Sequence, residues 1–421
     1  MPADFDLTIT ANHPNRTAEL TLCDSAGVQL AYRQTRFEDI SIRRQQGLFD
    51  LHNYLRVLVE AGKENAAMVE IGVCIAEEVL GEEIFEKLWA SKAQRTLRIQ
   101  LPGAEDTENH LVAALARVPW EIGRPQADAE TLGERNLLVR VVHDLQAPAS
   151  APIELEPDEA LRVLFVFAEA GGSLPLGARK ERRELWRLFE KEIYPQRRVV
   201  AHFLTHGVTR ERLKAQLQEH GGYHLVHWNG HGQTNLLELR KPGGASDLLS
   251  GSELLDLFND AGGFLPRLFF LSACHSGENL RVKDWNDFLA VAQGKEPGRK
   301  PAAKEAAARE LDLKEQPGYT GTAQALLQGG VLSVVAMRYT AGDDYARKLA
   351  VEFYRALLAH AQPKTVAAAL TVARQAVLDE EKHDPARFDV CDHATPVLYG
   401  AEQPGLTLAE GRSRQLNPRD P

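Results

Sequence analysis

The sequence predicts an α/β protein built around a mostly parallel sheet flanked by helices. From residue 161 onward, short apolar runs such as "LRVLFVFA" alternate with longer amphipathic runs such as "RKERRELWRLFEKEI". This alternation is typical of strand–helix–strand units with right-handed crossovers, which form parallel sheets. The chain has 421 residues, and 44% of them are hydrophobic, so a large buried core is available.

The elements of this half follow one another in a regular order. Apolar runs predict strands at 161–168, 197–205, 223–229, 266–273 and 330–337. Amphipathic runs predict helices at 179–193, 210–220, 250–260, 321–329 and 343–360, and one helix or two at 365–381.

The first 150 residues predict a less regular α+β half. Short strands are expected at 6–10, 18–23, 96–101 and 136–145, two or three helices between 55 and 90, and a helix at 110–122 that Pro119 stops. A stretch rich in Pro and Ala follows. We therefore expect an N-terminal half at 1–148, a linker at 149–160, an α/β domain at 161–403 and a tail or linker at 404–421.

One charge-rich segment interrupts the second half. Residues 293–318 are bracketed by Pro and Gly and follow an apolar run directly, which predicts a long exposed loop with one short helical stretch. The loop is either a tolerated surface insertion or a regulatory segment, and the sequence leaves both readings open.

Composition excludes several classes of protein. The net charge of −10 argues against direct binding of nucleic acid or of an anionic membrane. The start of the chain lacks a signal-peptide pattern, and the uncharged stretch 316–337 is interrupted by Gln and Gly, so we expect a cytoplasmic protein without a membrane span. Four scattered cysteines without a CxxC pair favour neither a zinc ribbon nor a disulfide framework.

Reactive side chains follow two of the expected strands. "HLVHWN" leads into Gly230, His231 and Gly232, and "FFLSA" leads into Cys274. If the two strands are neighbours in a parallel sheet, both end at the same edge, where α/β proteins bind their ligands. His231 and Cys274 are therefore expected to face each other there.

A thiol beside an imidazole has a specific chemical use. The imidazole shifts the thiol toward thiolate, which is the nucleophile, and can later protonate a leaving group. The backbone N–H groups of Gly232 and Cys274 are candidate donors to an oxyanion, with Gly232 allowing close approach. Gly230 is expected to provide the turn at its strand end.

Other readings of these residues compete with catalysis. A lone Cys274 is more often a small buried core residue. His227 and His231 have the HxxxH spacing of helical zinc peptidases, but an apolar strand-like run and the lack of a Glu after His227 disfavour that reading, so no metal is expected. His224 and His227 are interpreted as structural histidines.

The paired motifs "HWNGHG" and "LSACHSG" resemble those of CHAT-family caspase-like cysteine peptidases, in the clan of caspases, separases and gingipains. The segments "LARVPWEIG" and "ATPVLYG" also resemble parts of that family. The resemblance covers roughly residues 50–400. It implies a caspase-like fold, a cysteine endopeptidase with a His231–Cys274 dyad, no metal in the chemistry, and a role in bacterial defence or programmed cell death. We expect a protease that needs no cofactor and is latent in isolation.

The resemblance also bears on substrate choice. Metacaspases, which prefer basic residues, carry an Asp two positions before the cysteine, where this chain has Ser272. We therefore expect a small, polar or apolar residue before the cleaved bond. His275 is close enough in sequence to line the pocket. Asp343 and Asp344 precede a helical run and are interpreted first as N-cap carboxylates and second as substrate-binding acids.

A peptidase of this kind requires partners. The expected partners are a protein substrate and a regulatory or sensor protein, or an attached sensing domain, because a cytoplasmic peptidase without restraint would damage its host. The alternative function is a catalytically idle CHAT-type scaffold that binds a protein through the same crevice.

Two further stretches are interpreted as structural. Trp120 and Glu121 of "PWE" are interpreted as packing and a helix-end contact, and the charged run Arg179–Glu184 is interpreted as a solvated helix face.

Overall fold

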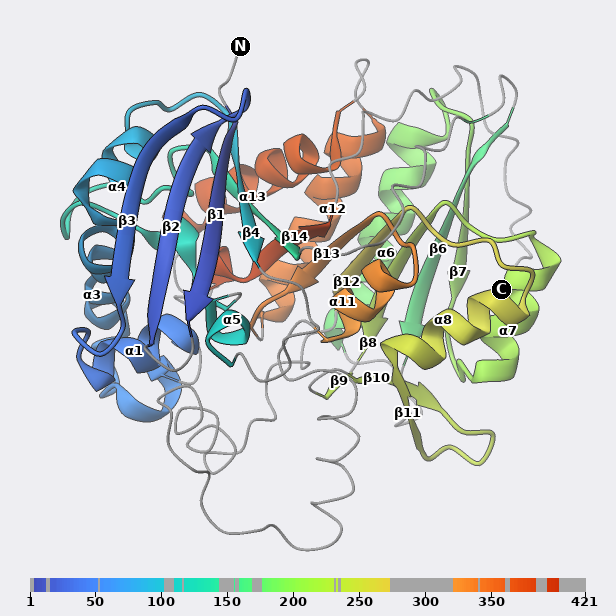
Figure 1. Ribbon diagram of the computed structural model, residues 1–421. Helices are drawn as coiled ribbons and strands as arrows, with labels where there is room; N and C mark the ends of the chain where they lie inside the picture. The colour runs from blue at the N-terminus through green and yellow to red at the C-terminus, as the bar shows by residue number, and fades with distance from the viewer. Residues whose placement is uncertain are drawn as a thin grey trace, which may run out of the picture.

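The structure is a computed structural model that describes most of the chain. The described residues are 4–12, 16–51, 54–101, 110–115, 117–143, 155, 159–168, 176–230, 232–233, 236–272, 321–339, 341–359, 364–383 and 392–400. In this part of the chain, eleven strands form one large sheet in the order β3-β2-β1-β4-β5-β14-β13-β12-β8-β6-β7 (Figure 1).

The second half of the chain contributes five parallel strands to this sheet. They are β6 (Leu161–Ala168), β7 (Val199–Leu204), β8 (Leu225–Gly230), β12 (Leu268–Ser272) and β13 (Ser333–Met337). Four of the five lie within the runs that predict strands, and β8 extends one residue past its run, so the expected mostly parallel sheet is confirmed. Every side chain of β12 is buried, which explains its continuous apolar sequence.

Helices cover both faces of these strands (Figure 1). One face of β6 packs Val163 and Phe165 against helices α6 (Leu176–Leu188), α12 (Asp343–Leu358) and α13 (Val366–His383). The other face packs Leu164 and Val166 into the core that includes α7 (Arg210–Glu219), α8 (Gly251–Asp260) and α11 (Gly321–Gln328). The run 365–381 therefore forms one helix.

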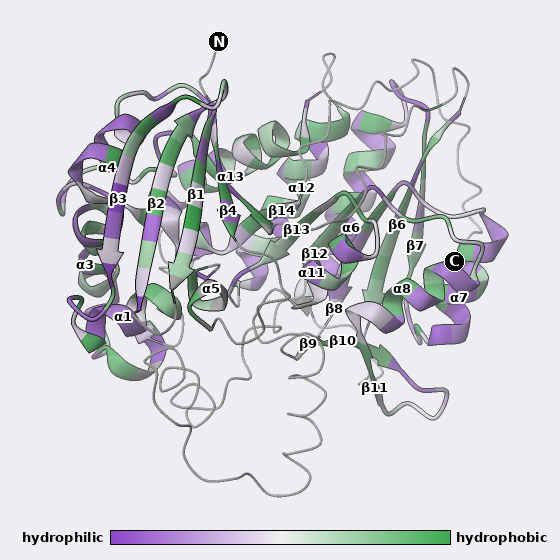
Figure 2. Ribbon diagram, viewed as in Figure 1, coloured by the Kyte–Doolittle hydropathy of each residue, from purple (hydrophilic) through white to green (hydrophobic). Residues whose placement is uncertain are grey.

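The N-terminal half is α+β and extends the same sheet. Three antiparallel strands, β1 (Phe5–Asn12), β2 (Thr17–Asp24) and β3 (Gln29–Arg36), lead through β1 to the parallel pair β4 (Arg95–Leu101) and β5 (Leu137–His143). Burial alternates along β2 and β3, so only one face of this part is covered, as the alternating colours in Figure 2 show.

Short helices complete the N-terminal half. They are α1 (Ile42–Phe49), α3 (Glu64–Cys74), α4 (Gly81–Trp89) and α5 (His110–Leu115), with π-helical turns η1 (Tyr54–Leu58) and η2 (Ile75–Leu80) and the 3-10 turn η3 (Trp120–Ile122). The helix expected at 110–122 is thus two pieces. Pro119 lacks an N–H and cannot continue a helix, and the chain resumes only as the short turn η3.

The last described strand joins the two halves. β14 (Pro396–Gly400), which follows the 3-10 turn η6 (Asp392–Ala394), pairs antiparallel with β13 and parallel with β5. The division expected at residues 149–160 stays a prediction. The expected loop at 293–318 and the tail at 404–421 lie outside the described residues.

No helix in the described part of the chain is both long enough and apolar enough to cross a bilayer.

A buried ion pair also joins the two halves. Glu121 of η3 and Arg338, the residue after β13, are both fully buried, and an Arg338 guanidinium N–H donates to the Glu121 carboxylate at 3.1 Å. The same nitrogen donates to the carbonyl oxygen of Ala394 at 3.0 Å. Burial alone would lower the pKa of Arg338, but Glu121 and two buried tyrosines raise it, so the guanidinium stays charged. Trp120 of the "PWE" segment is buried in the core, as its sequence predicts, whereas Glu121 forms a buried ion pair that the sequence does not predict.

Removal of one member of this pair should be costly. We expect Glu121→Ala to lower the free energy of unfolding by about 3–5 kcal/mol, because it leaves the Arg338 charge buried without its partner. Urea titration followed by circular dichroism measures this. The matched control is Glu130→Ala, which removes an exposed carboxylate and its ion pairs with Lys92 and Arg135 and should cost at most about 1 kcal/mol. Equal losses in both variants would contradict the assignment.

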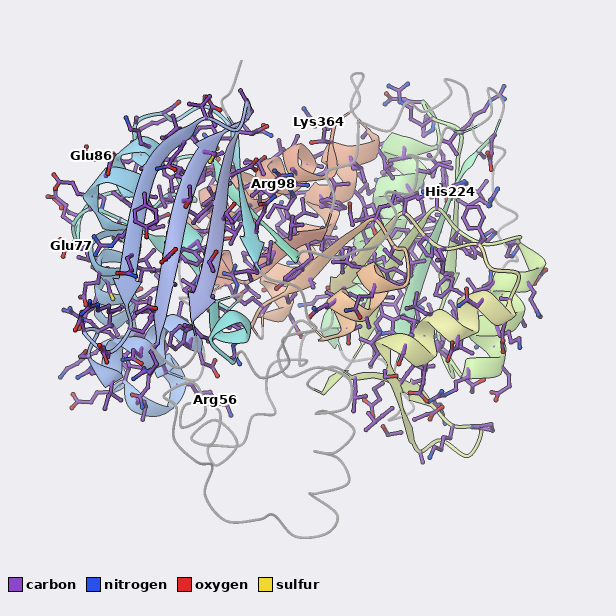
Figure 3. The ribbon with its side chains drawn as sticks, in the orientation of Figure 1. Arg56, Glu77, Glu86, Arg98, His224 and Lys364 are labelled. Carbon is purple, nitrogen blue, oxygen red and sulfur yellow. The ribbon has the colours of Figure 1, made fainter. Side chains whose placement is uncertain are left out.

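His224 is buried directly before the amino end of β8 (Figure 3). The backbone N–H of Arg162 donates to His224 Nδ1 at 2.9 Å, and the ring packs edge-on against Phe264. Burial, followed by the charge of Arg162, lowers the pKa of His224 to about 4. His224 is thus a structural histidine, as predicted, and stays neutral in the folded protein near neutral pH.

This lowered pKa predicts a pH-dependent stability. The unfolded chain binds a proton near pH 6.5 and the folded chain only near pH 4, so the contribution of neutral His224 is complete above about pH 6.5 and is lost as the pH falls toward 4. The variant His224→Asn keeps an acceptor for the Arg162 N–H. We expect its free energy of unfolding to fall by roughly 2–4 kcal/mol less than that of the unmodified chain between pH 7 and pH 4. Urea midpoints between pH 7 and pH 4 measure it.

The exposed His206 provides the control, because its backbone has a φ of 57° that asparagine tolerates. His206→Asn should leave the pH dependence unchanged. If His224→Asn declines as steeply as the unmodified chain, His224 does not carry this effect.

Candidate active site

Strands β8 and β12 are adjacent, parallel and in register. Leu268 pairs with Leu225 at their amino ends, and Ser272 pairs with Asn229 at their carboxyl ends. The two strands therefore end at one edge of the sheet, which confirms the neighbour relationship that the sequence suggests. In an open parallel sheet this edge is where ligands bind.

The two residues expected to carry the chemistry follow directly from these strand ends. His231 comes immediately after Gly230, the last residue of β8, and Cys274 comes two residues after Ser272. His231, Cys274 and His275 lie outside the described residues, so their roles stay predictions.

Gly232 is described at the backbone level. With Gln233 it forms the short strand β9, which pairs with β10 (Leu236–Arg240), and β10 pairs in turn with β11 (Ser246–Ser250). This small sheet lies beyond the carboxyl ends of β6 and β8 (Figure 1). The chain thus remains at the candidate edge after β8, where an N–H of Gly232 would have to lie to meet an oxyanion.

Gly230 serves a different purpose from the expected turn. Its φ does not lie in the left-handed region, and it ends β8 as an extended residue. A Cβ at this position would lie 2.7 Å from the carbonyl oxygen of Ala168 on β6. Gly230 is therefore required by the close approach of two neighbouring strands.

Ser272 lies at the end of β12 with no exposed surface. Its hydroxyl has no hydrogen-bond partner among the described residues. The polar residue at this position is thus part of the buried sheet edge, directly opposite Asn229. Its expected contact with a substrate stays a prediction.

Asp343 and Asp344 occupy the first turn of α12, so the interpretation as N-cap residues is wrong. The N-cap is Gly342, which has no side chain, and its N–H donates to the carboxylate of Asp392 at 3.0 Å. Acids in a first turn still interact favourably with the helix dipole. The helix begins at Asp343, one residue earlier than an Asp343 cap and two residues earlier than an Asp344 cap would require.

The two acids differ in their surroundings. Asp344 accepts a hydrogen bond from Arg347 at 2.9 Å. Asp343 is exposed, and its carboxylate lies so close to Gly177 that a Cβ there would overlap with it. Because α12 follows β13, its first turn lies at the same edge as the ends of β8 and β12. A substrate-binding role for Asp343 or Asp344 stays a prediction.

A buried His–Glu pair lies behind this edge. His227 of β8 is fully buried, its Nε2 lies 2.8 Å from the carboxylate of Glu181 on α6, and its ring stacks on Phe270. His227 Nδ1 has no partner among the described residues. His227 is therefore structural, as predicted, and lies on a strand, where the helical zinc spacing does not apply.

Glu181 contradicts the interpretation of Arg179–Glu184 as a solvated helix face. Its side chain is 2% exposed because it turns toward β8. A signal for this is present in the sequence: Ala178, Glu181, Leu185 and Leu188 recur at the three- and four-residue spacing of one helix face, and all four are buried. The many charged residues in "RKERRE" hide this helical spacing of the buried residues.

The chain was compared with known proteins by its sequence and by its structure. The sequence matches no curated protein. Among solved structures, the chain is similar to the separase–securin complex of Saccharomyces cerevisiae, with a TM-score of 0.46 and 9% sequence identity. That match covers 95% of this chain and 30% of the other, so the chain spans under a third of its length.

The sequence profile of the CHAT domain family matches residues 80–401. The match takes in β8, β12 and the residues that follow each of them, together with η3 and β14. It covers more than half of the chain and confirms the resemblance that the two motifs indicate. The chain belongs to the CHAT domain family.

Proposed function

We propose that the chain is a cysteine endopeptidase of the caspase-like type. The observation that carries the proposal is the register of β8 and β12. Because the two strands end at one edge of the sheet, the chain segments that contain His231 and Cys274 both begin at that edge. Membership of the CHAT family supports a caspase-like protease.

The proposed reaction uses the thiol and imidazole in turn. His231 takes the proton of Cys274, and the thiolate attacks the carbonyl carbon of the scissile peptide bond. N–H groups of Gly232 and Cys274 stabilise the oxyanion, and His231 then protonates the departing amine. Water, activated by the same imidazole, hydrolyses the thioester and restores the thiol. No cofactor takes part.

The proposed biological role is that of a latent protease in bacterial defence or programmed cell death. It acts on a protein substrate in the cytoplasm and is restrained until a regulatory or sensor protein, or an attached sensing domain, binds. The support for this role is the family resemblance alone. We expect a thiol-reactive peptide warhead to modify Cys274 of the isolated chain slowly. Rapid and complete modification in the absence of any partner would contradict latency.

The alternative is a catalytically idle scaffold that binds a protein through the same edge. It is favoured only if the thiol and the imidazole do not act together. The intact His231 and Cys274 argue against it, because a scaffold requires neither residue.

A thiol-reactive peptide warhead distinguishes the two functions. We expect it to modify Cys274 selectively near neutral pH, because an adjacent imidazole lowers the pKa of a thiol. His231→Ala should slow the modification at least tenfold, since catalytic groups acting as a unit fail together. Mass spectrometry of the labelled full chain identifies the modified residue.

Two of the other cysteines, Cys74 and Cys23, serve as internal controls. Cys74 is buried, and burial, with a smaller contribution from Glu78, raises its pKa to about 12, so it should remain unlabelled. Cys23 is half-buried, and a Cys23→Ser variant should label at Cys274 unchanged. Labelling of Cys23 and Cys274 at equal rates, unaffected by His231→Ala, would favour the scaffold.

A further inference from the structure

The outer face of α6 and of the turn that extends it, η4 (Phe189–Ile193), carries a row of cations. The row, called here the α6 cation row, consists of four exposed residues at four-residue spacing: Arg179, Arg183, Arg187 and Lys191. Side chains four residues apart lie on one side of a helix. Trp186 lies beside the row with half of its side chain exposed. A chain of net charge −10 thus concentrates positive charge on one helix.

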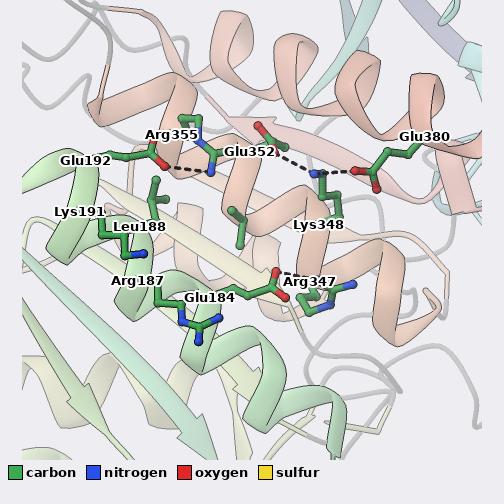
Figure 4. A pocket seen from close by; sticks show the side chains of 11 residues that line it. Glu184, Arg187, Leu188, Lys191, Glu192, Arg347, Lys348, Glu352, Arg355 and Glu380 are labelled. Carbon is green, nitrogen blue, oxygen red and sulfur yellow. Dashed lines mark hydrogen bonds and ion pairs between the residues drawn. The ribbon is translucent and has the colours of Figure 1, made fainter.

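A cavity of about 320 Å³ adjoins this row, between α6 and α12 (Figure 4). Its carboxylates are already paired with cations of α12: Glu184 with Arg347, Glu380 with Lys348, and Glu192 with Arg355. Glu352 lies between the last two cations and pairs with both.

Two cations of the cavity remain outside this network. Arg187 and Lys191 line the cavity and form no ion pair within the described part of the chain (Figure 4). Both are exposed, whereas Arg347 is largely buried at 11% exposure. The cavity can therefore accept negative charge from outside without breaking an existing pair.

The composition of this surface favours a peptide over nucleic acid. Glu184 and Glu192 lie in the same cavity wall, and a phosphate backbone with a charge at every step would meet them. A peptide can set carboxylates against the cations and an apolar side chain against Trp186, which is the residue mixture of protein interfaces. The row is about 18 Å long at 1.5 Å per residue, the length of about six extended residues.

We propose that the α6 cation row, with Trp186 and the adjoining cavity, binds an acidic segment of a partner protein. Its carboxylates contact Arg183, Arg187 and Lys191, and an apolar side chain of the segment covers Trp186. The proposal does not depend on peptidase activity, because the surface consists only of described residues outside the candidate active site.

The test uses the full chain and a fluorescein-labelled peptide of sequence Glu-Glu-Glu-Leu-Glu-Glu-Glu. We expect saturable binding by fluorescence anisotropy that weakens as salt rises, because exposed charges are screened over about 8 Å at physiological ionic strength. The same peptide with every Glu replaced by Gln should not bind. Equal binding of the two peptides would overturn the proposal.

Charge reversal locates the binding surface. Arg183→Glu combined with Arg187→Glu should weaken binding at least tenfold, since like charges then face each other. The matched control is the double variant Lys87→Glu, Lys241→Glu, which reverses two exposed cations elsewhere and changes the net charge equally. It should change the affinity for the peptide less than twofold. Trp186→Ala should weaken binding severalfold. Thermal unfolding verifies that each variant is folded.

Competition decides between ligand classes. An unlabelled single-stranded oligonucleotide of equal charge, or anionic lipid vesicles, should compete less well than the unlabelled acidic peptide. If the oligonucleotide or the vesicles bind more tightly and lose affinity in the Arg183→Glu, Arg187→Glu chain, the ligand is not a peptide and the proposal fails. It also fails if the α6 reversal and the control reversal weaken peptide binding equally.

Discussion

The buried pair of Glu121 and Arg338 is the constraint on which the rest of the sheet depends. Two buried charges are costly unless they meet each other with good geometry. Glu121 comes from the turn after α5, and Arg338 comes directly after β13, so the pair can form only when β5, β14 and β13 lie side by side. Tyr339, the next residue, donates its hydroxyl hydrogen to the carbonyl oxygen of Arg117 at 3.0 Å. The N-terminal half is in this way attached to the segment that leads from β13 to α12 at the candidate edge.

The sequence predicts the parallel strands well because their signal is local. Runs such as "LRVLFVFA" are buried on both faces, and continuous apolar stretches between amphipathic helices have few other structures available. The strand β3 is missed because its buried face consists of Ala31 and Thr35, which give almost no hydrophobic period. The position of β14 between β13 and β5 cannot be predicted from its own residues, since pairing between distant segments is set by tertiary contacts.

The candidate site is predicted less completely than the fold, for a related reason. The motif around His231 and Cys274 identifies two strand ends, and the observed register of β8 and β12 supplies the neighbour relationship that the motif needs. The environment behind the motif requires three dimensions. Glu181 meets His227 across two elements that are 46 positions apart in the chain, and its charged neighbours hide the helical phase. Asp343 and Asp344 lie one and two residues past the actual N-cap, Gly342, which has no side chain to signal a cap in the sequence.

Helix α6 combines both kinds of charged residue on its two sides. Its inner acids are used internally: Glu181 bonds His227 of β8, and Glu184 pairs with Arg347 of α12. Of its outer cations, Arg187 and Lys191 form no ion pair within the described part of the chain. Exposed cations of this kind gain little for folding, whereas a row of cations beside an exposed tryptophan is the composition of a binding surface. Helix α6 packs against α12 and is joined to β8 through the Glu181–His227 pair. Because α12 and β8 both reach the candidate edge, a partner on the outer face of α6 would bind a helix held directly by the active-site scaffold.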